Sequence, residues 1–524
     1  MPAAIVCVAA MLYGWHLHRA PVNLGGDEAQ FLTNAYSLAT TGRDVSGRTL
    51  PLFINLAEPS AGLQSSVIWY QPVLFYLTAA ELLVVPLTEV SVRVVTVLIG
   101  LVNLALMYAI ARRLFGTRGF AVIAIFMLAL SPAHAIFSRI GLDYIAPVPF
   151  VLGWLWLFLV SLERDRKAIA CATGVVLGVG CYSYVAAWAL MPMLLVISWY
   201  IWWREKRVAP VFASGLGFLL PMLPLLVWLA THPETFSATL SRYHPYDTTH
   251  LSLLKGVKDM LTYNNLQERV SVYWDYFNPT FLFLVGGTNM TASTRNAGVF
   301  LWPIAPLFVA GLGEVWARRR AAIGTVLLAG LALAPLPAAL LNERYAIQRA
   351  LLLLPFIALI STFGVVALWQ QRRQVIRAGV VVVFVLAALQ FATFYRDYLT
   401  EYQLRSAIWF DPVDFRDVAN YLIAADSSGT VPAVYLSEDL DDAKPRWRFY
   451  LDLQHRETLL GKTRYFHASS LDVRAVPPGS LLVVYAGDPV LPAWLEGGHI
   501  AVAKRIVDVA GSKTAVILTR VAAR

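Results

Sequence analysis

Eleven stretches of mostly apolar residues constrain this sequence more than any other feature, because each is close to the length of a membrane-crossing helix. A helix needs about 20 such residues to cross the hydrocarbon core of a bilayer. The sequence therefore predicts an all-α polytopic membrane protein with about 11 transmembrane helices. The stretches run approximately over 2–17, 92–111, 119–137, 145–162, 168–184, 186–203, 210–230, 298–316, 321–341, 348–369 and 375–394.

The overall composition agrees with this prediction. Hydrophobic residues make up 58% of the chain and charged residues 14%, against about 45–50% and about 25% in soluble domains. So apolar a chain is neither a disordered segment nor a string of ordinary soluble domains. Cys7, Cys171 and Cys181 are the only cysteines and lie in apolar stretches, which excludes a disulfide scaffold.

The net charge of +9 comes from cations that gather in short loops. Lys and Arg concentrate in the cytoplasmic loops of membrane proteins, so these loops are predicted to be cytoplasmic. The same gathering argues against a nucleic-acid partner. The basic loops hold Arg112, Arg113 and Arg118; Arg164, Arg166 and Lys167; Arg204, Lys206 and Arg207; Arg318, Arg319 and Arg320; and Arg372, Arg373 and Arg377.

Alternation of the remaining loops then predicts the topology. The N-terminus is cytoplasmic in a multi-pass protein of the inner (plasma) membrane, with the first stretch an uncleaved helix followed by His16, His18 and Arg19. The loops 18–91 and 231–297 and everything after 395 lie outside the cytoplasm. The apolar segment Val67–Val85 would reverse this order if it crossed the membrane, so we expect a juxtamembrane helix within the first outer loop.

The last part of the chain changes character. Strand-like runs at Val431–Leu436 and Leu481–Tyr485 alternate with a helical pattern over 411–425 and a turn at Pro477-Pro478-Gly479. We therefore expect a transmembrane domain over 1–395 and a small extracytoplasmic α/β domain over 396–524.

The first outer loop carries two adjacent carboxylates, Asp27 and Glu28, directly after the first apolar stretch. One interpretation is a helix N-terminus, where acidic residues cap the chain and complement the helix dipole. The other is a general base at the membrane surface. Neighbouring side chains on a helix point about 100° apart, so the two carboxylates would have different roles.

A second charged pair, Arg139 and Asp143, lies in a short outer loop. The two residues are four apart and can pair on one helical turn. They also lie on the predicted membrane side of Asp27, where polar groups beside hydrocarbon are costly and often functional.

Aromatic and polar residues collect on this outer side, including Tyr70, Gln71, Tyr182 and Tyr184. Interfacial belts of membrane proteins use the same residue types. A sugar site also uses aromatic faces and hydrogen-bonding edges, so both interpretations stay open.

The ordered set of motifs resembles the GT-C glycosyltransferases of the protein O-mannosyltransferase and aminoarabinose-transferase type. The resemblance covers roughly 1–395. It departs from the family at Gln71-Pro72-Val73, where a second proline is common, and near Gly286-Gly287, where an acidic residue is common. The matching motifs are Asp27-Glu28, Tyr70-Gln71-Pro72, the helix from Arg93 to Gly116, Ser138-Arg139 through Asp143, Gly180-Cys181-Tyr182-Ser183-Tyr184, Phe277 through Phe283, and Gln348-Arg349-Ala350-Leu351.

The resemblance implies a GT-C fold with juxtamembrane helices and a sugar donor linked to polyprenyl phosphate. It implies transfer on the extracytoplasmic face, with inversion, to a lipid, glycan or protein acceptor. Asp27 would accept or align the acceptor's proton, while Glu28 or Asp143 would hold the acceptor, a sugar hydroxyl or a metal. A divalent metal (Mg²⁺ or Mn²⁺) held by Asp27 and Asp143 is compatible with such carboxylates but not required by them.

Two outer cations, Arg344 and Arg349, are candidates for the donor phosphate. They can instead anchor the helix that follows by snorkelling to the interface. Arg349 matches the family's Arg-Ala-Leu pattern, and a departing phosphate needs a fixed guanidinium in low-dielectric surroundings. The other candidate binding residues are Tyr70, Gln71, Arg139, Tyr182 and Tyr184.

Two other function classes stay open. A transporter or flippase of lipid-linked sugars would place polar residues or broken helices near the bilayer midplane, whereas the charges here are predicted at one surface. The second class is a polymerase or ligase that acts on lipid-linked glycans.

Overall fold

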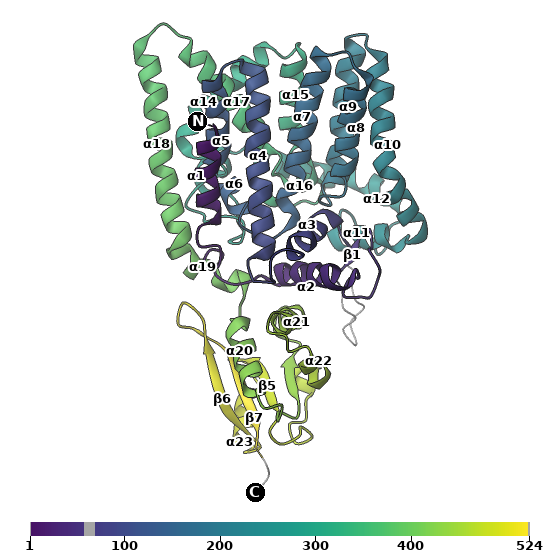
Figure 1. Ribbon diagram of the computed structural model, residues 1–524, viewed down its shortest axis with the longest axis vertical. Coiled ribbons are helices and arrows are strands. Elements are labelled where there is room, and N and C mark those ends of the chain that lie inside the picture. Colours follow the sequence, from purple (N-terminus) through teal and green to yellow (C-terminus); the bar gives the residue numbers. More distant parts are fainter. Residues whose placement is uncertain (1, 57–68, 522–524) are drawn as a thin grey trace. The chain divides into compact units, whose positions relative to one another are not determined.

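A computed structural model describes residues 2–56 and 69–521. The chain divides into two compact units (Figure 1). The first unit comprises 1–15, 46–77 and 93–397, and the second comprises 16–45, 78–92 and 398–524.

The first unit is a bundle of apolar helices, and each of the predicted stretches is largely helical. Among the described residues, 5 helical segments are long and apolar enough to cross a membrane: Ser91–Phe115, Asp143–Glu163, Val208–Thr231, Ala322–Leu340 and Gln374–Leu399. The predicted stretches thus coincide with helices, while the number of about 11 crossings stays a prediction, because the other helices are shorter or less apolar. The bundle consists of α1 (Pro2–Gly14), α4 (Ser91–Phe115), α5 (Arg118–Ala129), α6 (Pro132–Phe137), α7 (Pro147–Glu163), α8 (Lys167–Gly180), α9 (Ala187–Arg204), α10 (Val208–Thr231), α14 (Ala305–Ala317), α15 (Ala322–Leu333), α16 (Leu336–Leu340), α17 (Leu353–Trp369) and α18 (Gln374–Leu399).

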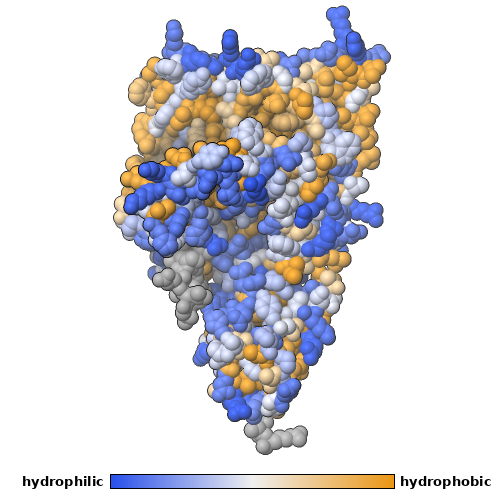
Figure 2. Space-filling view, turned by 180° about the vertical axis from the view of Figure 1, so that it is seen from behind, coloured by the Kyte–Doolittle hydropathy of each residue, from blue (hydrophilic) through white to orange (hydrophobic). Residues whose placement is uncertain are grey.

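Apolar side chains gather over the upper part of the face that Figure 2 shows. The helix α10 exposes Leu216, Leu219 and Leu223, and α18 exposes Val385 and Leu389. Large exposed apolar surfaces are rare in water-soluble monomers. Together with the apolar helices they indicate a membrane protein.

Glycines let neighbouring helices of the bundle approach closely. A Cβ atom on Gly174 or Gly178 of α8 would lie 1.9 Å or 2.7 Å from a backbone oxygen of α10, and one on Gly217 of α10 would lie 2.1 Å from the Cys171 oxygen. Small residues at such contacts are typical of membrane helices, which associate by close packing rather than by the hydrophobic effect. The loop after α8 is thereby placed against α10.

The segment Val67–Val85 contains the helix α3 (Pro72–Leu82), which has 11 residues. The first two residues of the segment 67–85 lie outside the described part of the chain. A helix of this length is too short to cross a bilayer, in agreement with the predicted juxtamembrane helix. The side of the membrane on which it lies stays a prediction.

The second unit is built on a five-stranded mixed sheet with the order β4-β3-β5-β7-β6 (Figure 1). The strands β4, β3 and β5 pair in parallel, whereas β7 pairs antiparallel with both β5 and β6. The predicted strand over 481–485 coincides with β5, and the predicted strand over 431–436 overlaps β3. The strands are β3 (Val434–Ser437), β4 (Thr463–Phe466), β5 (Leu481–Tyr485), β6 (Ile500–Val507) and β7 (Lys513–Arg520).

The helix predicted over 411–425 begins later, as α20 (Phe415–Ala425). The physical reason is the side chain of Asp411, which accepts hydrogen bonds from the backbone N–H groups of Val413 (3.2 Å) and Phe415 (2.6 Å). Such bonds hold the chain in a turn before a helix starts. The other helices of the unit are α2 (Gly26–Thr41), α19 (Glu401–Phe410), α21 (Ala443–Leu453), α22 (Thr458–Lys462) and α23 (Leu491–Glu496).

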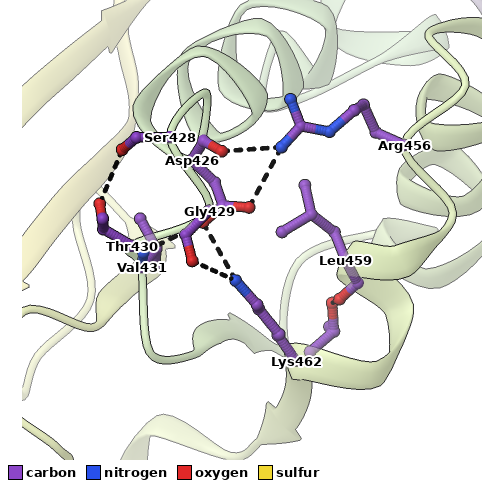
Figure 3. Close-up of polar contacts among 9 residues, drawn as sticks. Asp426, Ser428, Gly429, Thr430, Val431, Arg456, Leu459 and Lys462 are labelled. Carbon is purple, nitrogen blue, oxygen red and sulfur yellow. Dashed lines mark hydrogen bonds and ion pairs between the residues drawn. The ribbon is translucent and has the colours of Figure 1, made fainter.

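A buried carboxylate, Asp426, fastens the turn between α20 and β3 (Figure 3). Its oxygens accept from Arg456 Nη2 at 3.1 Å, from Lys462 Nζ at 3.2 Å and from the Val431 N–H at 3.0 Å. Removing one partner of a buried ion pair leaves an uncompensated charge, which makes such clusters structurally demanding. This cluster connects the end of α20 to α22.

The loop 18–91 is divided between the two compact units, whereas the sequence grouped it with the rest of 1–395. The structure groups 16–45 and 78–92 with the tail. The reason is tertiary packing, because α2 lies along α21. Hydropathy does not reveal such contacts between distant segments.

Candidate active site

The acidic motif forms the first turn of α2. Gly25 has an extended backbone before the helix, and its N–H donates to Glu28 Oε2 at 3.0 Å. Glu28 is only 1% exposed, whereas Asp27 is exposed. The two carboxylates therefore differ as their helical spacing predicts: Glu28 caps the helix and Asp27 points outward.

Arg139 makes structural contacts with the first helix. Its side chain is fully buried, and Nη1 donates to the backbone oxygens of Leu12 at 3.0 Å and Tyr13 at 2.7 Å. Carbonyls at a helix C-terminus lack intrahelical partners, so a guanidinium there stabilises the helix end. Arg139 thus holds the end of α1, from which the chain continues to the acidic motif.

Arg349 lies at the centre of a partly buried polar cluster in the first unit. We call it the Arg349 cluster, and it contains Arg349, Glu343, Tyr184, Tyr243 and Asp143. Arg349 Nη1 donates to the Tyr184 hydroxyl, and Nε and Nη2 each lie 3.3 Å from a Glu343 carboxylate oxygen. The guanidinium lies 4.7 Å from the Tyr243 ring centroid and 5.7 Å from that of Tyr184. Only 12% of the Arg349 side chain is exposed. The Arg349 guanidinium is thus held in place by its neighbours, and the Glu343 carboxylate partly neutralises its charge.

Asp143 joins this cluster through a short helix. The turns η1 (Asp143–Ile145) and η4 (Ile347–Arg349) pack against each other. Burial raises the pKa of the Tyr243 hydroxyl, Arg349 opposes that shift, and the negative charge of Asp143 adds to it. Tyr243 therefore stays protonated at neutral pH and can donate a hydrogen bond. The structure thus brings Asp143, Tyr184 and Arg349 together, as candidate site residues from three separate motifs.

Arg344 has a different environment. It forms an ion pair with Asp275 and donates to Ser271 Oγ at 3.3 Å, and 47% of its side chain is exposed. Both partners lie on α13 (Tyr263–Asp275), a helix of the long loop 231–297 that also contains α11 (Glu234–Tyr243) and α12 (Leu253–Met260). Arg344 therefore fastens the segment before Arg349 to α13.

Tyr182 has a structural role within the bundle. Its hydroxyl donates to the Pro221 oxygen at 2.5 Å and accepts from the Leu225 N–H at 3.0 Å. These two backbone groups would bond to each other in a regular helix, so Tyr182 is inserted into the ladder of α10 next to its internal prolines. The hydroxyl is thus occupied by α10.

Tyr70 and Gln71 follow an aromatic cluster that motif analysis missed. Tyr70 ends the short strand β2 (Trp69–Tyr70), which pairs with β1 (Ile54–Asn55), and Gln71 is buried. The Trp69 ring lies 5.6 Å from Trp228, which stacks on His232 at 4.0 Å, and Arg48 lies 4.7 Å from the Trp69 centroid. In the sequence, the one feature that pointed to this aromatic cluster was Trp69, which directly precedes the Tyr70-Gln71 motif.

Motif analysis also missed Glu343 and Tyr243. Glu343 lies six residues before Arg349 and Tyr243 ends a helix of the long loop. Neither stands in a recognisable motif, so only the fold reveals their contacts with Arg349.

Structural comparison decides the fold. ArnT from Cupriavidus metallidurans bound to undecaprenyl phosphate superposes with a TM-score of 0.60 at 14% identity, over 98% of this chain and 97% of that one. The chain has the GT-C fold. The GT-C resemblance seen in the motifs is confirmed at the level of the fold.

Further comparisons agree with a GT-C architecture. The apo state of the same ArnT gives a TM-score of 0.60 at 13% identity, over 98% and 97% of the two chains. The Archaeoglobus fulgidus oligosaccharyltransferase in its apo form gives 0.51 at 13% identity, over 93% of this chain and 69% of that one. The family model of dolichyl-phosphate-mannose-protein mannosyltransferases matches residues 70–228. Among curated proteins, none matches the sequence significantly.

The described residues do not form a protein-built metal centre. Over 2–56 and 69–521, no group of three or more His, Cys, Asp or Glu side chains lies close enough to hold an ion. Asp27 and Asp143, the pair considered from the sequence, lie in different units.

Proposed function

We propose that this chain is a membrane glycosyltransferase that moves one sugar from a polyprenyl-phosphate carrier to an acceptor on the extracytoplasmic face. The observation that carries the proposal is the GT-C fold, matched over almost the whole chain by a protein bound to undecaprenyl phosphate. The mannosyltransferase family match over 70–228 supports the same reaction class.

In this proposal the Arg349 cluster binds the donor phosphate. A guanidinium presents planar donors that match phosphate oxygens, and its attraction is stronger where water is excluded. Arg349 is already held by Glu343 and Tyr184, so little side-chain entropy is lost when phosphate binds. Tyr243 offers a further hydroxyl donor beside it.

Asp27 acts as the base. An acceptor hydroxyl oxygen attacks C1 of the sugar, the bond from C1 to the phosphate oxygen breaks, and the electron pair leaves on the polyprenyl phosphate. The hydroxyl proton passes to the Asp27 carboxylate, which the first turn of α2 leaves exposed. A single displacement of this kind inverts the anomeric carbon. Asp143 and the aromatic residues Tyr70 and Tyr184 are proposed to hold sugar or acceptor groups.

The test is release of polyprenyl phosphate by the purified protein in lipid nanodiscs, supplied with undecaprenyl-phosphate sugars. A glycosyltransferase breaks the bond from C1 to oxygen and releases the lipid phosphate when an acceptor is present. A flippase moves the intact donor and releases none. Mass spectrometry of the lipid-linked sugars that accumulate in a deletion strain identifies the sugar.

A further inference from the structure

We propose that the C-terminal part of the second unit is a positioning clamp for the acidic motif, rather than a separate substrate-binding domain. The clamp holds both ends of the first outer loop, at α2 and at Glu89. This inference rests on the proposed function, because the group it positions is the proposed base Asp27.

The first contact is between the start of α2 and the start of α21. A Cβ atom on Gly26 would lie 1.7 Å from Asp442 Oδ2 and 2.2 Å from its Cγ. The Asp442 carboxylate therefore rests directly against the Gly26 backbone, next to Asp27. A negative charge is favourable at the N-terminus of a helix, and only glycine leaves the space for it.

The residues behind this contact are held together by the buried side chain of Arg446. Arg446 of α21 is 2% exposed, donates to the Phe410 oxygen at 2.8 Å and to the Asp441 oxygen at 2.5 Å, and lies 3.5 Å from Asp411 Oδ1. The turn that presents Asp442 is thereby fixed to the end of α19. The Phe410 ring in turn lies 3.8 Å from the Cβ position of Gly25.

The second contact holds the other end of the loop. Arg416 of α20 donates from Nε to Glu89 Oε1 at 2.8 Å and from Nη2 to the second oxygen, which is a bidentate pair. The Tyr450 hydroxyl of α21 donates to the same Glu89 oxygen at 3.1 Å. Bidentate guanidinium–carboxylate pairs fix orientation as well as distance. Residues far apart in sequence thus fasten 16–45 and 78–92 to one domain.

The consequence for the reaction is geometric. A base must lie within hydrogen-bond reach of the proton that it accepts. A displacement of about 1 Å can cost about 100-fold in rate. The Asp442 contact lies one residue from Asp27, so a shift of the Gly26 backbone moves the Asp27 carboxylate directly.

Gly26→Ala tests this clamp, with Asp442→Gly as its suppressor. Alanine is the better helix former, so helix propensity alone predicts no loss, whereas the clamp predicts a steric clash with Asp442. We expect Gly26→Ala to lower kcat about 10- to 100-fold with an unchanged donor KM. In the double variant Gly26→Ala/Asp442→Gly the clash is relieved, so kcat rises above that of Gly26→Ala, but it stays below the wild-type value because the Asp442 contact is lost. Glycine suits position 442, where φ is +51°.

The matched control is Gly461→Ala in the same domain, where an added Cβ meets no atom within 4 Å. This variant keeps wild-type kinetics. Wild-type kcat in Gly26→Ala, or a loss that Asp442→Gly leaves unrelieved, would overturn the clamp.

Hydrogen exchange over 24–32 separates failure of this inference from failure of the proposed function. Exchange is expected to rise in Gly26→Ala and to fall again in part in the double variant, whether or not the chain transfers sugar. If wild-type protein releases no polyprenyl phosphate, the proposed function fails, and the exchange pattern alone decides the clamp. Unchanged exchange in Gly26→Ala contradicts it.

Discussion

The Arg349 cluster and the acidic motif place their charged groups in opposite surroundings. Arg349 is 12% exposed and surrounded by Glu343, Tyr184 and Tyr243. Asp27 is exposed on the first turn of a helix whose cap is made by its neighbour Glu28. A cation that binds phosphate gains from low dielectric and preorganisation, whereas a base has to remain reachable. In the proposed reaction, the less exposed cation therefore binds the anion and the exposed carboxylate takes the proton.

Asp27→Asn tests the role of the exposed carboxylate and has the largest expected effect on the rate of transfer. The amide keeps the size of the side chain but removes the basic oxygen, so transfer should fall by about 10²- to 10⁴-fold. Release of polyprenyl phosphate by the purified variant measures this. Hydrogen exchange of α2 should be unchanged, and near-normal turnover would remove Asp27 from its proposed role.

Arg349→Lys tests the role of the less exposed charged group, the Arg349 guanidinium. Lysine keeps the charge and snorkels equally well, but it lacks the fork that reaches Glu343 and phosphate together. A lost charged hydrogen bond is worth about 1.5–3 kcal/mol, so donor KM and kcat together should worsen about 10- to 100-fold.

Arg344→Lys is the matched control for that variant, because Arg344 is 47% exposed and paired with Asp275. Its effect should be much smaller. Full wild-type kinetics in Arg349→Lys, or a larger effect at Arg344, would show that burial does not select the phosphate ligand.

The two units are also expected to differ in how their stability depends on pH. Burial raises the pKa of Asp414 to about 6, with Asp411 adding to the shift, and burial raises that of Asp452 to about 6. Both pKa values lie above the unfolded value of about 3.9. The protonated forms of Asp414 and Asp452 therefore stabilise the folded second unit. This contribution is fully present below about pH 4 and is lost as pH rises through the folded pKa near 6. We expect the second unit to lose about 1–3 kcal/mol from these groups between pH 4 and 7.

Hydrogen exchange of β5 amides at increasing urea, corrected for intrinsic rates, measures this loss in the full chain. The amides of α17 in the first unit serve as the internal reference. The double variant Asp414→Asn/Asp452→Asn should flatten the pH dependence of β5. A dependence that survives in this variant would assign it to other groups.

Glu28 gives the smallest expected effect. Glutamine keeps an acceptor for the Gly25 N–H, so Glu28→Gln should retain both activity and helix stability. Glu28→Ala loses the cap, at a cost of about 1 kcal/mol. If Glu28→Gln instead loses activity while α2 keeps its exchange protection, Glu28 has a catalytic role beyond its cap.

Local patterns were sufficient for much of the architecture. The apolar stretches predicted the helices of the first unit, and a strand-like apolar run predicted β5 over 481–485. The expected start of α20 was wrong by four residues, because the Asp411 side chain holds a turn before Phe415. Side-chain bonds of this kind depend on atomic geometry and not on the periodicity of apolar residues.

The sequence by itself determined the membrane class, the order of the helices and the candidate charges, because hydropathy and residue type are local properties. Only the tertiary structure decided how those charges differ. Arg349 meets Tyr184 across 165 residues of chain and Glu89 meets Arg416 across 327. Asp442 reaches Gly26 from another domain segment. Such pairs form because packing brings distant segments together, and burial then decides which cation is held in low dielectric and which carboxylate remains in contact with water.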